Sequence, residues 1–242
     1  MHRAERRAVA ALDRKNLIRI MPTQGDDPID VPRLHLITPA APGAAVVEAT
    51  ARMLAAGAPL LQIRCKEAGD RVRWEHTAVL RGLCREAGAW CLVNDRVDLA
   101  LAVGADGVHL GDEDLPVDLA RRLLGPQPIV GATCRDPESA RRAVDAGATY
   151  LGVGPAYATA TKAGLPPALG PRGIAAVAAA VDVPVIAIAG VTAARVPQLL
   201  DAGAWGVAVV GAVYDARDPA AAVAGLLEAL GEDAPLPTGG LR

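Results

Sequence analysis

The chain has 242 residues, a net charge of −2, 52% hydrophobic residues and 21% charged residues. These values are typical of a globular protein with one large domain or two small ones. They exclude the strong positive charge expected of a nucleic-acid or anionic-membrane partner, and no apolar run is long enough to span a bilayer. We therefore expect no nucleic acid and no membrane among the partners.

The chain ends and the cysteines narrow the class of protein further. The four cysteines are Cys65, Cys84, Cys91 and Cys134. They form no CxxC pair, so a structural zinc site is not expected, and unpaired thiols suit a reducing cytoplasm. Residues 1–31 lack the apolar core of a signal peptide, and residues 232–242 are rich in proline and glycine. We expect a mobile extension, a folded domain over 32–231 and a disordered tail.

One short pattern recurs along the folded part. A small residue, glycine and alanine precede an apolar run in AAGAPLLQI (55–63), EAGAWCLV (86–93), AVGADGVHL (102–110), DAGATYLGV (145–153) and DAGAWGVAV (201–209). Each copy predicts a helix that ends at glycine, followed by a tight turn into a buried strand. Three further strands are predicted at Leu34–Ile37, Pro128–Gly131 and Val183–Ile188. Amphipathic segments such as Val46–Ala56, Pro137–Ala146 and Arg195–Ala202 predict the helices between them.

Eight evenly spaced strand–helix units predict the α/β class, as a (β/α)8 TIM barrel in a single domain. Continuous apolar strands are typical of a parallel sheet that is covered on both faces. An open doubly wound sheet is the alternative, but the first strand runs into ITPAAPG rather than a GxGxxG motif. In a barrel, polar residues at the carboxyl ends of the strands face the active site.

The second predicted strand ends in the sequence QIRCK. Alternation along the strand places Gln62, Arg64 and Lys66 on one side. If that side faces the mouth of the barrel, it presents one amide and two cations. Lys66 is one of only three lysines in a chain that otherwise uses arginine, which favours a task that arginine cannot perform. The alternative is a salt-bridged strand end, with Glu67 and Asp70 as partners.

Acidic residues follow the next two predicted strands. Asn94 and Asp95 follow the third strand, and residues 112–114 (DED) follow the fourth. Adjacent parallel strands lie about 4.8 Å apart, so Asp95 can face one of these acids across the mouth. Two carboxylates beside two cations suit a diphosphate bound with Mg²⁺. The alternative is that Asp95 and Asp114 cap the helices that follow them.

Nothing in the sequence predicts a protein nucleophile. His109 lies inside the fourth predicted strand, and we interpret it as a packed residue rather than a catalyst. Ser139 lies in a predicted helix without a base beside it, and no local pattern places a histidine next to a cysteine.

The later strands predict a second anion site. The sixth, Tyr150–Gly154, is followed by a loop with two threonines and Lys162, and such a loop can wrap an anion or close over a substrate. Gly190 follows the seventh strand and Gly211 the eighth, where barrels often bind phosphate on backbone N–H groups. A polar surface loop and plain glycine turns are the alternatives. A transferase that joins a diphosphate donor to a phosphorylated acceptor would need both anion sites.

These segments resemble the thiamine-phosphate synthase family in the family's order, roughly from Leu34 to Val213. The matching sequences are LHLITP, QIRCK, LVNDRVDLALAVGADGVHLGDEDLP, the TATK of GPAYATATKAG, IAIAGVT and GVAVVGAV. The resemblance implies transfer of an aminomethylpyrimidine from its diphosphate to the ring nitrogen of a thiazole phosphate, with Mg²⁺ required. It implies small-molecule substrates, and the sequence leaves a homo-oligomer open. Because an electron-rich aminopyrimidine stabilises a methylene cation, we expect the C–O bond to break before the thiazole attacks.

Site residues carry over from the resemblance by motif position. Arg64, Lys66 and Lys162 are implied as the catalytic cations. The residues implied to bind the pyrimidine diphosphate are Gln62, Arg64, Lys66, Asn94 and Lys162; those implied to bind the thiazole phosphate are Thr159, Thr161, Gly190, Val210 and Gly211; those implied to hold Mg²⁺ are Asp95 and Asp114.

Three positions depart from the family's usual pattern. Thr133, also placed among the substrate-binding residues, stands where serine is usual, Ala189 replaces the first of two glycines, and Gly211 stands where serine is frequent. Threonine keeps the hydroxyl, whereas the other two changes bear on the thiazole phosphate side. Two alternative functions are a thiazole tautomerase-like paralogue and a protein that binds thiamine precursors without turnover. The intact QxRxK, ND and TxTK motifs and the acidic loop argue against the tautomerase.

Overall fold

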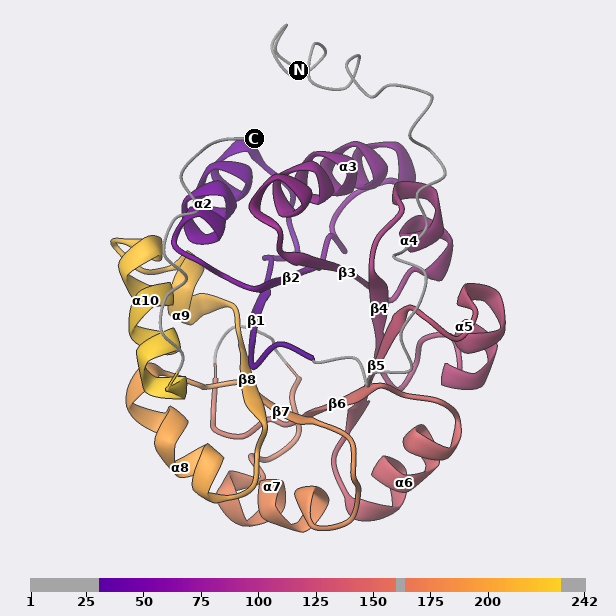
Figure 1. Ribbon diagram of the computed structural model, residues 1–242, viewed down its shortest axis with the longest axis vertical. Helices are drawn as coiled ribbons and strands as arrows, with labels where there is room; N and C mark the ends of the chain where they lie inside the picture. Colours follow the sequence, from indigo (N-terminus) through magenta and orange to yellow (C-terminus); the bar gives the residue numbers. More distant parts are fainter. Residues whose placement is uncertain (1–30, 160–163, 232–242) are drawn as a thin grey trace, which may run out of the picture.

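A computed structural model describes residues 31–159 and 164–231 of the chain. The expected extension over 1–31, apart from Val31, and the expected tail over 232–242 lie outside the described residues. The strands are β1 (Leu34–Ile37), β2 (Leu60–Ile63), β3 (Trp90–Asn94), β4 (Gly107–Leu110), β5 (Ile129–Cys134), β6 (Tyr150–Val153), β7 (Val185–Ile188) and β8 (Gly206–Val209). They form a closed parallel barrel in chain order, and β8 pairs with β1 (Figure 1). The predicted TIM barrel is confirmed.

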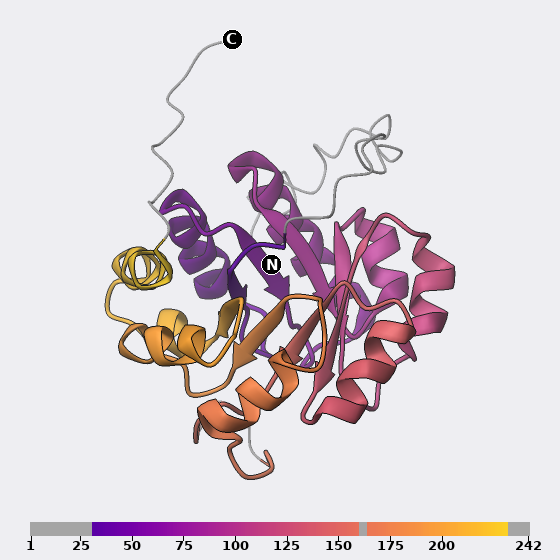
Figure 2. The ribbon, with the colours of Figure 1, turned by 60° about the horizontal axis from the view of Figure 1, so that its bottom comes forward.

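Helices surround the ring of strands (Figures 1 and 2). They are α2 (Ala44–Ala55), α3 (Asp70–Ala87), α4 (Val97–Val103), α5 (Val117–Leu124), α6 (Pro137–Asp145), α7 (Gly170–Ala178), the 3-10 helix η2 (Ala193–Arg195), α8 (Val196–Asp201), α9 (Gly211–Tyr214) and α10 (Pro219–Leu230). As the recurring pattern predicts, α3 and α4 end on the left-handed glycines Gly88 and Gly104. Within the described residues, none of the helices is long and apolar enough to cross a membrane.

The apolar residues divide into layers on the two faces of the barrel wall. One layer joins strand residues such as Leu36 and Ile63 to helix residues such as Leu80. The other lies inside the barrel and includes Leu60 and Leu92. Burying each leucine contributes ~2 kcal/mol. These apolar layers surround a smaller number of buried polar side chains, among them His35, Gln62 and His109.

The second strand is shorter than predicted, because β2 ends at Ile63 and leaves Arg64 and Lys66 in the loop that follows. The amide of Thr38 still donates to the carbonyl of Gln62 at 3.0 Å. The next donor, the amide of Arg64, instead meets the Thr38 side-chain hydroxyl at 2.8 Å. A hydroxyl thus takes the place of the backbone partner that would have continued the strand.

Candidate active site

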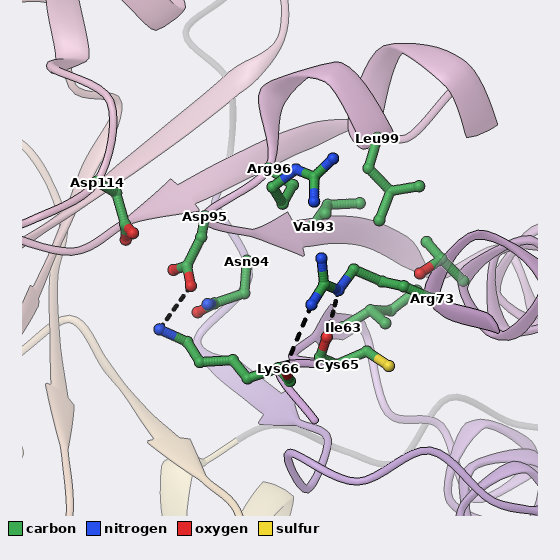
Figure 3. A pocket seen from close by; sticks show the side chains of 11 residues that line it. Ile63, Cys65, Lys66, Arg73, Val93, Asn94, Asp95, Arg96, Leu99 and Asp114 are labelled. Atoms are coloured by element: carbon green, nitrogen blue, oxygen red, sulfur yellow. Dashed lines mark hydrogen bonds and ion pairs between the residues drawn. The ribbon is translucent and has the colours of Figure 1, made fainter. Parts of the chain in front are cut away.

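A cavity of about 300 Å³ opens where β2, β3 and β4 end (Figure 3). Its lining consists of Ile63, Cys65, Lys66, Arg73, Thr77, Val93, Asn94, Asp95, Arg96, Leu99 and Asp114. Four of the predicted site residues therefore meet here, namely Lys66, Asn94, Asp95 and Asp114. Gln62 and Arg64 precede Lys66 in the chain and do not line this cavity in the described part of the structure.

The charged centre of the cavity is formed by Lys66, Asp95 and Asp114. The Nζ atom of Lys66 lies 2.6 Å from Oδ2 of Asp95, as Figure 3 shows. Burial and the nearby Asp114 carboxyl raise the pKa of Asp95, whereas Lys66 acts in the opposite direction. Two carboxyl groups this close repel each other when both are ionised, unless a cation or a proton lies between them.

Asp95 is held in an unusual backbone conformation. Its φ is 68°, in the left-handed region that side-chain-bearing residues rarely adopt. The backbone amide of Asp95 donates to the carbonyl of His109 on the neighbouring strand at 2.8 Å. The helix-capping alternative is wrong for this residue, because α4 has Arg96 at its N-cap and no side-chain cap. Strain of this kind clusters at functional sites.

Asp114 closes a turn rather than capping a helix. Its Oδ2 accepts from the backbone amide of Gly111 at 2.6 Å, and the N-cap of α5 is Pro116. The capping alternative is therefore wrong here too. Of the three acids after β4, Asp114 lines the cavity, whereas Asp112 and Glu113 are exposed.

Arg73 of α3 fixes the loop that carries Lys66. Its guanidinium donates to the backbone carbonyls of Cys65, Lys66 and Ala68 at 2.7, 3.3 and 2.8 Å. Asp70, which the sequence offered as a partner for the QIRCK segment, instead pairs with Arg73 and Arg96 at 3.1 and 2.9 Å. The salt-bridged alternative is therefore wrong for Lys66 and Asp70. The loop is held through its backbone, which leaves the Lys66 ammonium group for Asp95.

A second group of polar residues lies inside the barrel beneath the mouth. Gln62 is buried, and its Nε2 lies 3.5 Å from the hydroxyl of Tyr150. His109 is buried between Tyr150 and Thr133, as the packed-residue interpretation predicts. The sequence reasoning missed Tyr150, although two strand glycines, Gly131 and Gly152, were a signal that large side chains fill this space.

The ends of β6 and β7 come together on the other side of the mouth. The amides of Ala156 and Tyr157 donate to the carbonyls of Ile188 and Ala189 at 2.7 and 3.1 Å. A Cβ atom on Gly190 would lie 2.7 Å from the Ala158 carbonyl oxygen, so glycine permits this close approach.

The second predicted anion site lies partly within the described residues. Thr159, half-buried, follows the segment that contacts Gly190. Val210 and Gly211 lie at the start of α9. Thr161 and Lys162 lie outside the described residues.

Ala189 has a φ of 73°, at the position where the resembling family usually has glycine. The left-handed region costs a residue with a Cβ roughly 1–2 kcal/mol. We expect Ala189→Gly to raise the free energy of unfolding by about 1 kcal/mol, after the greater entropy of glycine in the unfolded chain is subtracted. Urea unfolding measures the change. Ala176→Gly in α7 is the control, with an expected loss of about 1 kcal/mol; equal losses in both variants would contradict the strain argument.

The carboxylate pair fits a Mg²⁺ ion that is also bound by a ligand. Among the residues that the structure describes, no group of three or more His, Cys, Asp or Glu could hold a metal. Mg²⁺, however, usually keeps several waters and is bound by one or two carboxylates together with substrate phosphates. Asp95 and Asp114 supply such a pair. Burial and the Asp114 carboxyl raise the pKa of Asp95, and a bound cation would act in the opposite direction, as Lys66 does.

Comparisons with known proteins identify relatives of this chain. A family model described as thiamine monophosphate synthase matches residues 34–213. The thiamine-phosphate synthase of Salinispora arenicola is 53% identical over 202 residues, which cover 82% of this chain and 97% of that protein. That of Haloarcula marismortui is 44% identical, over 81% of this chain and 96% of that protein.

Solved structures extend the comparison to three dimensions. Thiamine phosphate pyrophosphorylase from Pyrococcus furiosus has a TM-score of 0.74 and 36% identity, and the match covers 82% of this chain and 95% of that one. A 3-hexulose-6-phosphate synthase from Salmonella typhimurium has a TM-score of 0.63 at 16% identity, over 82% of this chain and 98% of that one. At that identity the second likeness shows the barrel fold alone.

Proposed function

Because this chain belongs to the thiamine monophosphate synthase family, we propose that it is a Mg²⁺-dependent transferase that forms thiamine phosphate. The donor is 4-amino-2-methyl-5-(diphosphooxymethyl)pyrimidine, the acceptor is 4-methyl-5-(2-phosphoethyl)thiazole, and diphosphate is released. The observation that carries the proposal is the cluster of Lys66, Asp95 and Asp114 at the ends of β2–β4. The four cysteines are free and buried, which suits a reducing cytoplasm.

Lys66, Asn94 and the two aspartates would receive the diphosphate end of the donor. Lys66 is a compact, mobile cation whose side chain is 45% exposed, so it can turn from Asp95 to a phosphate oxygen. Arg64 and Lys162 would supply further positive charge. Asp95 and Asp114 would hold Mg²⁺, which when bound offsets negative charge on the departing diphosphate.

The chemistry requires positioning more than a protein nucleophile. The donor carbon is a benzylic-type methylene on an electron-rich aminopyrimidine, so the C–O bond can break with charge spread over the ring. The site residues would then hold the thiazole nitrogen close to the methylene and stabilise the diphosphate as it leaves. The structure gives Ser139 another task than that of a nucleophile, because its side chain forms a capping box with Asp136 at the start of α6.

The acceptor phosphate would lie near Thr159, Thr161 and the glycines after β7 and β8. Gly190 keeps its close approach to the β6 loop, and Gly211 retains a backbone N–H at the start of α9. Replacing serine by Gly211 removes one hydroxyl from this side. We therefore expect this change to raise the KM for the thiazole phosphate and to leave the type of reaction the same.

A substrate-omission assay tests the proposed function. Purified protein is incubated with both substrates and Mg²⁺, and released diphosphate is measured. We expect release only when both substrates and the metal are present, and loss of release on adding a chelator, with recovery on adding Mg²⁺ in excess. Binding of either substrate without any release would contradict the proposal and support the precursor-binding alternative.

Lys162→Ala is expected to lower turnover at least ~100-fold, which corresponds to ~2.7 kcal/mol, because a cation is removed from the departing diphosphate. Steady-state kinetics measures the effect, and circular dichroism checks the fold. Lys15→Ala is the matched control, since Lys15 lies outside the residues that match the family and should leave turnover unchanged. A near-normal rate for Lys162→Ala would remove this lysine from the chemistry.

A further inference from the structure

Two of the buried rings inside the barrel are joined by a hydrogen bond, His109 from β4 and Tyr150 from β6. The ring of His35 from β1 packs edge-on against Tyr150, with the ring centroids 4.8 Å apart. Strand register places His109, Gly131 and Tyr150 in one row across β4, β5 and β6. A Cβ atom on Gly131 would lie 2.2 Å from Cζ of Tyr150, and one on Gly152 would lie 2.9 Å from Cε1 of His109. The backbone therefore makes room for two rings to which the proposed transfer assigns no role.

A chain of hydrogen bonds runs through these rings from β2 to β5. The Tyr150 hydroxyl lies 3.5 Å from Nε2 of Gln62 and 2.8 Å from Nδ1 of His109. Nε2 of His109 lies 2.9 Å from Oγ1 of Thr133. Gln62, His109 and Tyr150 are 3%, 8% and 1% exposed, whereas Thr133 is exposed. Two buried rings thus connect the buried amide of Gln62 on β2 with the exposed Thr133 on β5.

The hydrogen bonds from Gln62 to Thr133 can all be made in only two ways, which differ in the direction of donation. The His109 ring is buried and each of its nitrogens faces a hydroxyl group, so the hydrogen bonds are met by a neutral ring that carries a single N–H. In the first pattern, Gln62 donates to Tyr150, Tyr150 donates to Nδ1 of His109, and Nε2–H donates to Thr133. The Gln62 carbonyl oxygen and the Thr133 hydroxyl hydrogen are then left for a ligand.

The second pattern reverses every bond. Nδ1–H of His109 donates to Tyr150, Tyr150 donates to the carbonyl oxygen of Gln62, and Thr133 donates to Nε2. Gln62 then offers its NH₂ group to the ligand and Thr133 offers a lone pair. A mixture of the two patterns either leaves a buried hydrogen without an acceptor or sets two acceptors against each other, and both are costly. The direction of the Gln62 amide and that of the Thr133 hydroxyl are therefore coupled through Tyr150 and His109.

We propose that Tyr150 is a positioning residue that selects the first pattern, so that Gln62 presents an acceptor and Thr133 a donor to the bound ligand. In the structure it is the amide nitrogen of Gln62 that faces the Tyr150 hydroxyl. An acceptor on β2 opposite a donor on β5 suits a heterocycle with an exocyclic amino group and ring nitrogens. The inference rests on the proposed function for the identity of that heterocycle, an aminopyrimidine.

The kinetic test uses Tyr150→Phe, which keeps the ring against Gly131 and removes only the hydroxyl. We expect the KM for the pyrimidine diphosphate to rise at least ~10-fold, because the amide is free to turn. The KM for the thiazole phosphate should stay within about twofold. Tyr214→Phe is the matched control, since the hydroxyl of this half-buried tyrosine bonds Thr50 at 2.7 Å between α9 and α2. It should leave both KM values unchanged.

A binding test separates positioning from a merely structural role. Calorimetry compares the aminopyrimidine alcohol with an analogue that carries an oxo group in place of the amino group. Wild-type protein should prefer the amino compound, and Tyr150→Phe should reduce that preference at least ~10-fold. A general loss of packing would weaken both compounds equally and would overturn the inference.

The other possible results of the binding test also support or overturn one of the two claims. Wild-type protein that binds both compounds alike, or neither, would overturn the inference, as would a Tyr150→Phe variant with an unchanged preference. Wild-type protein that prefers the amino compound but releases no diphosphate would overturn the proposed function alone. The two claims can therefore fail separately.

Discussion

Replacing Asp95 with asparagine is expected to lower turnover about 1,000-fold, or ~4 kcal/mol, and to abolish the response to Mg²⁺. The substitution keeps the size of the side chain but removes the charge that pairs with Lys66 at 2.6 Å and, under the proposed function, with the metal. Asparagine tolerates the left-handed backbone at φ 68°. Lost activity would therefore come from lost charge rather than from unfolding.

Steady-state rates over a Mg²⁺ titration measure this effect, with urea unfolding as the check on stability. The matched control is Asp98→Asn, which removes an exposed carboxylate that pairs with Arg96 at 2.6 Å at the start of α4. The control should stay within about twofold of wild-type turnover, since surface ion pairs contribute little. An Asp95→Asn protein with an unchanged Mg²⁺ titration would refute the ligand role of Asp95.

The second large effect is a loss of stability in mild acid. Burial lowers the pKa of His35 to about 3 and that of His109 to about 4. Between these values and the ordinary pKa of about 6.5, the unfolded chain binds more protons than the folded one. The free energy of unfolding should therefore fall as the pH drops below ~6.5, by several kcal/mol at pH 4. The raised pKa values of Asp95 and Asp106 act in the opposite direction and offset part of this loss.

Urea unfolding at pH 7.5 and pH 5 measures the acid effect. His109→Gln removes one titrating ring, so its stability should fall less between the two pH values than that of wild-type protein, whatever its stability at pH 7.5. His76→Gln is the comparison variant, because burial lowers the pKa of His76 less than that of His109, so its pH dependence should lie between those of His109→Gln and wild-type protein. A His109→Gln protein with the wild-type pH dependence would show that His109 does not titrate in this range.

The periodic features of the sequence were sufficient to predict the barrel. The repeated glycine–alanine–apolar pattern predicts strand β4, and the apolar run Leu34–Ile37, which lacks the pattern, predicts β1 with the bounds that the structure shows. The resemblance to the synthase family is confirmed by the match over residues 34–213. The end of β2 was placed too late. Alternation continues through Arg64 and Lys66, but the hydrogen bond that ends the strand comes from the Thr38 hydroxyl, which no local pattern in the strand reveals.

Side-chain contacts between different strands of the barrel were harder to predict from the sequence than the strands themselves. Lys66, Asp95 and one acid of residues 112–114 were predicted to meet because parallel strands share one edge, and the family resemblance implied Asp114. The structure places Lys66, Asp95 and Asp114 around one cavity. Which acid after β4 lines that cavity depends on a turn closed by Asp114 and the amide of Gly111. The Tyr150–His109 chain depends on registers between three strands, and a single sequence carries no direct record of such pairing.

The most direct test of the central claim is the ratio of thiamine phosphate formed to diphosphate released, measured in the same reaction. Transfer from donor to acceptor at the β2–β4 site predicts one molecule of thiamine phosphate for each diphosphate, and neither product without the thiazole phosphate. Diphosphate released at the same rate without thiamine phosphate would mean that the cluster of Lys66, Asp95 and Asp114 hydrolyses the donor instead, and would contradict the account.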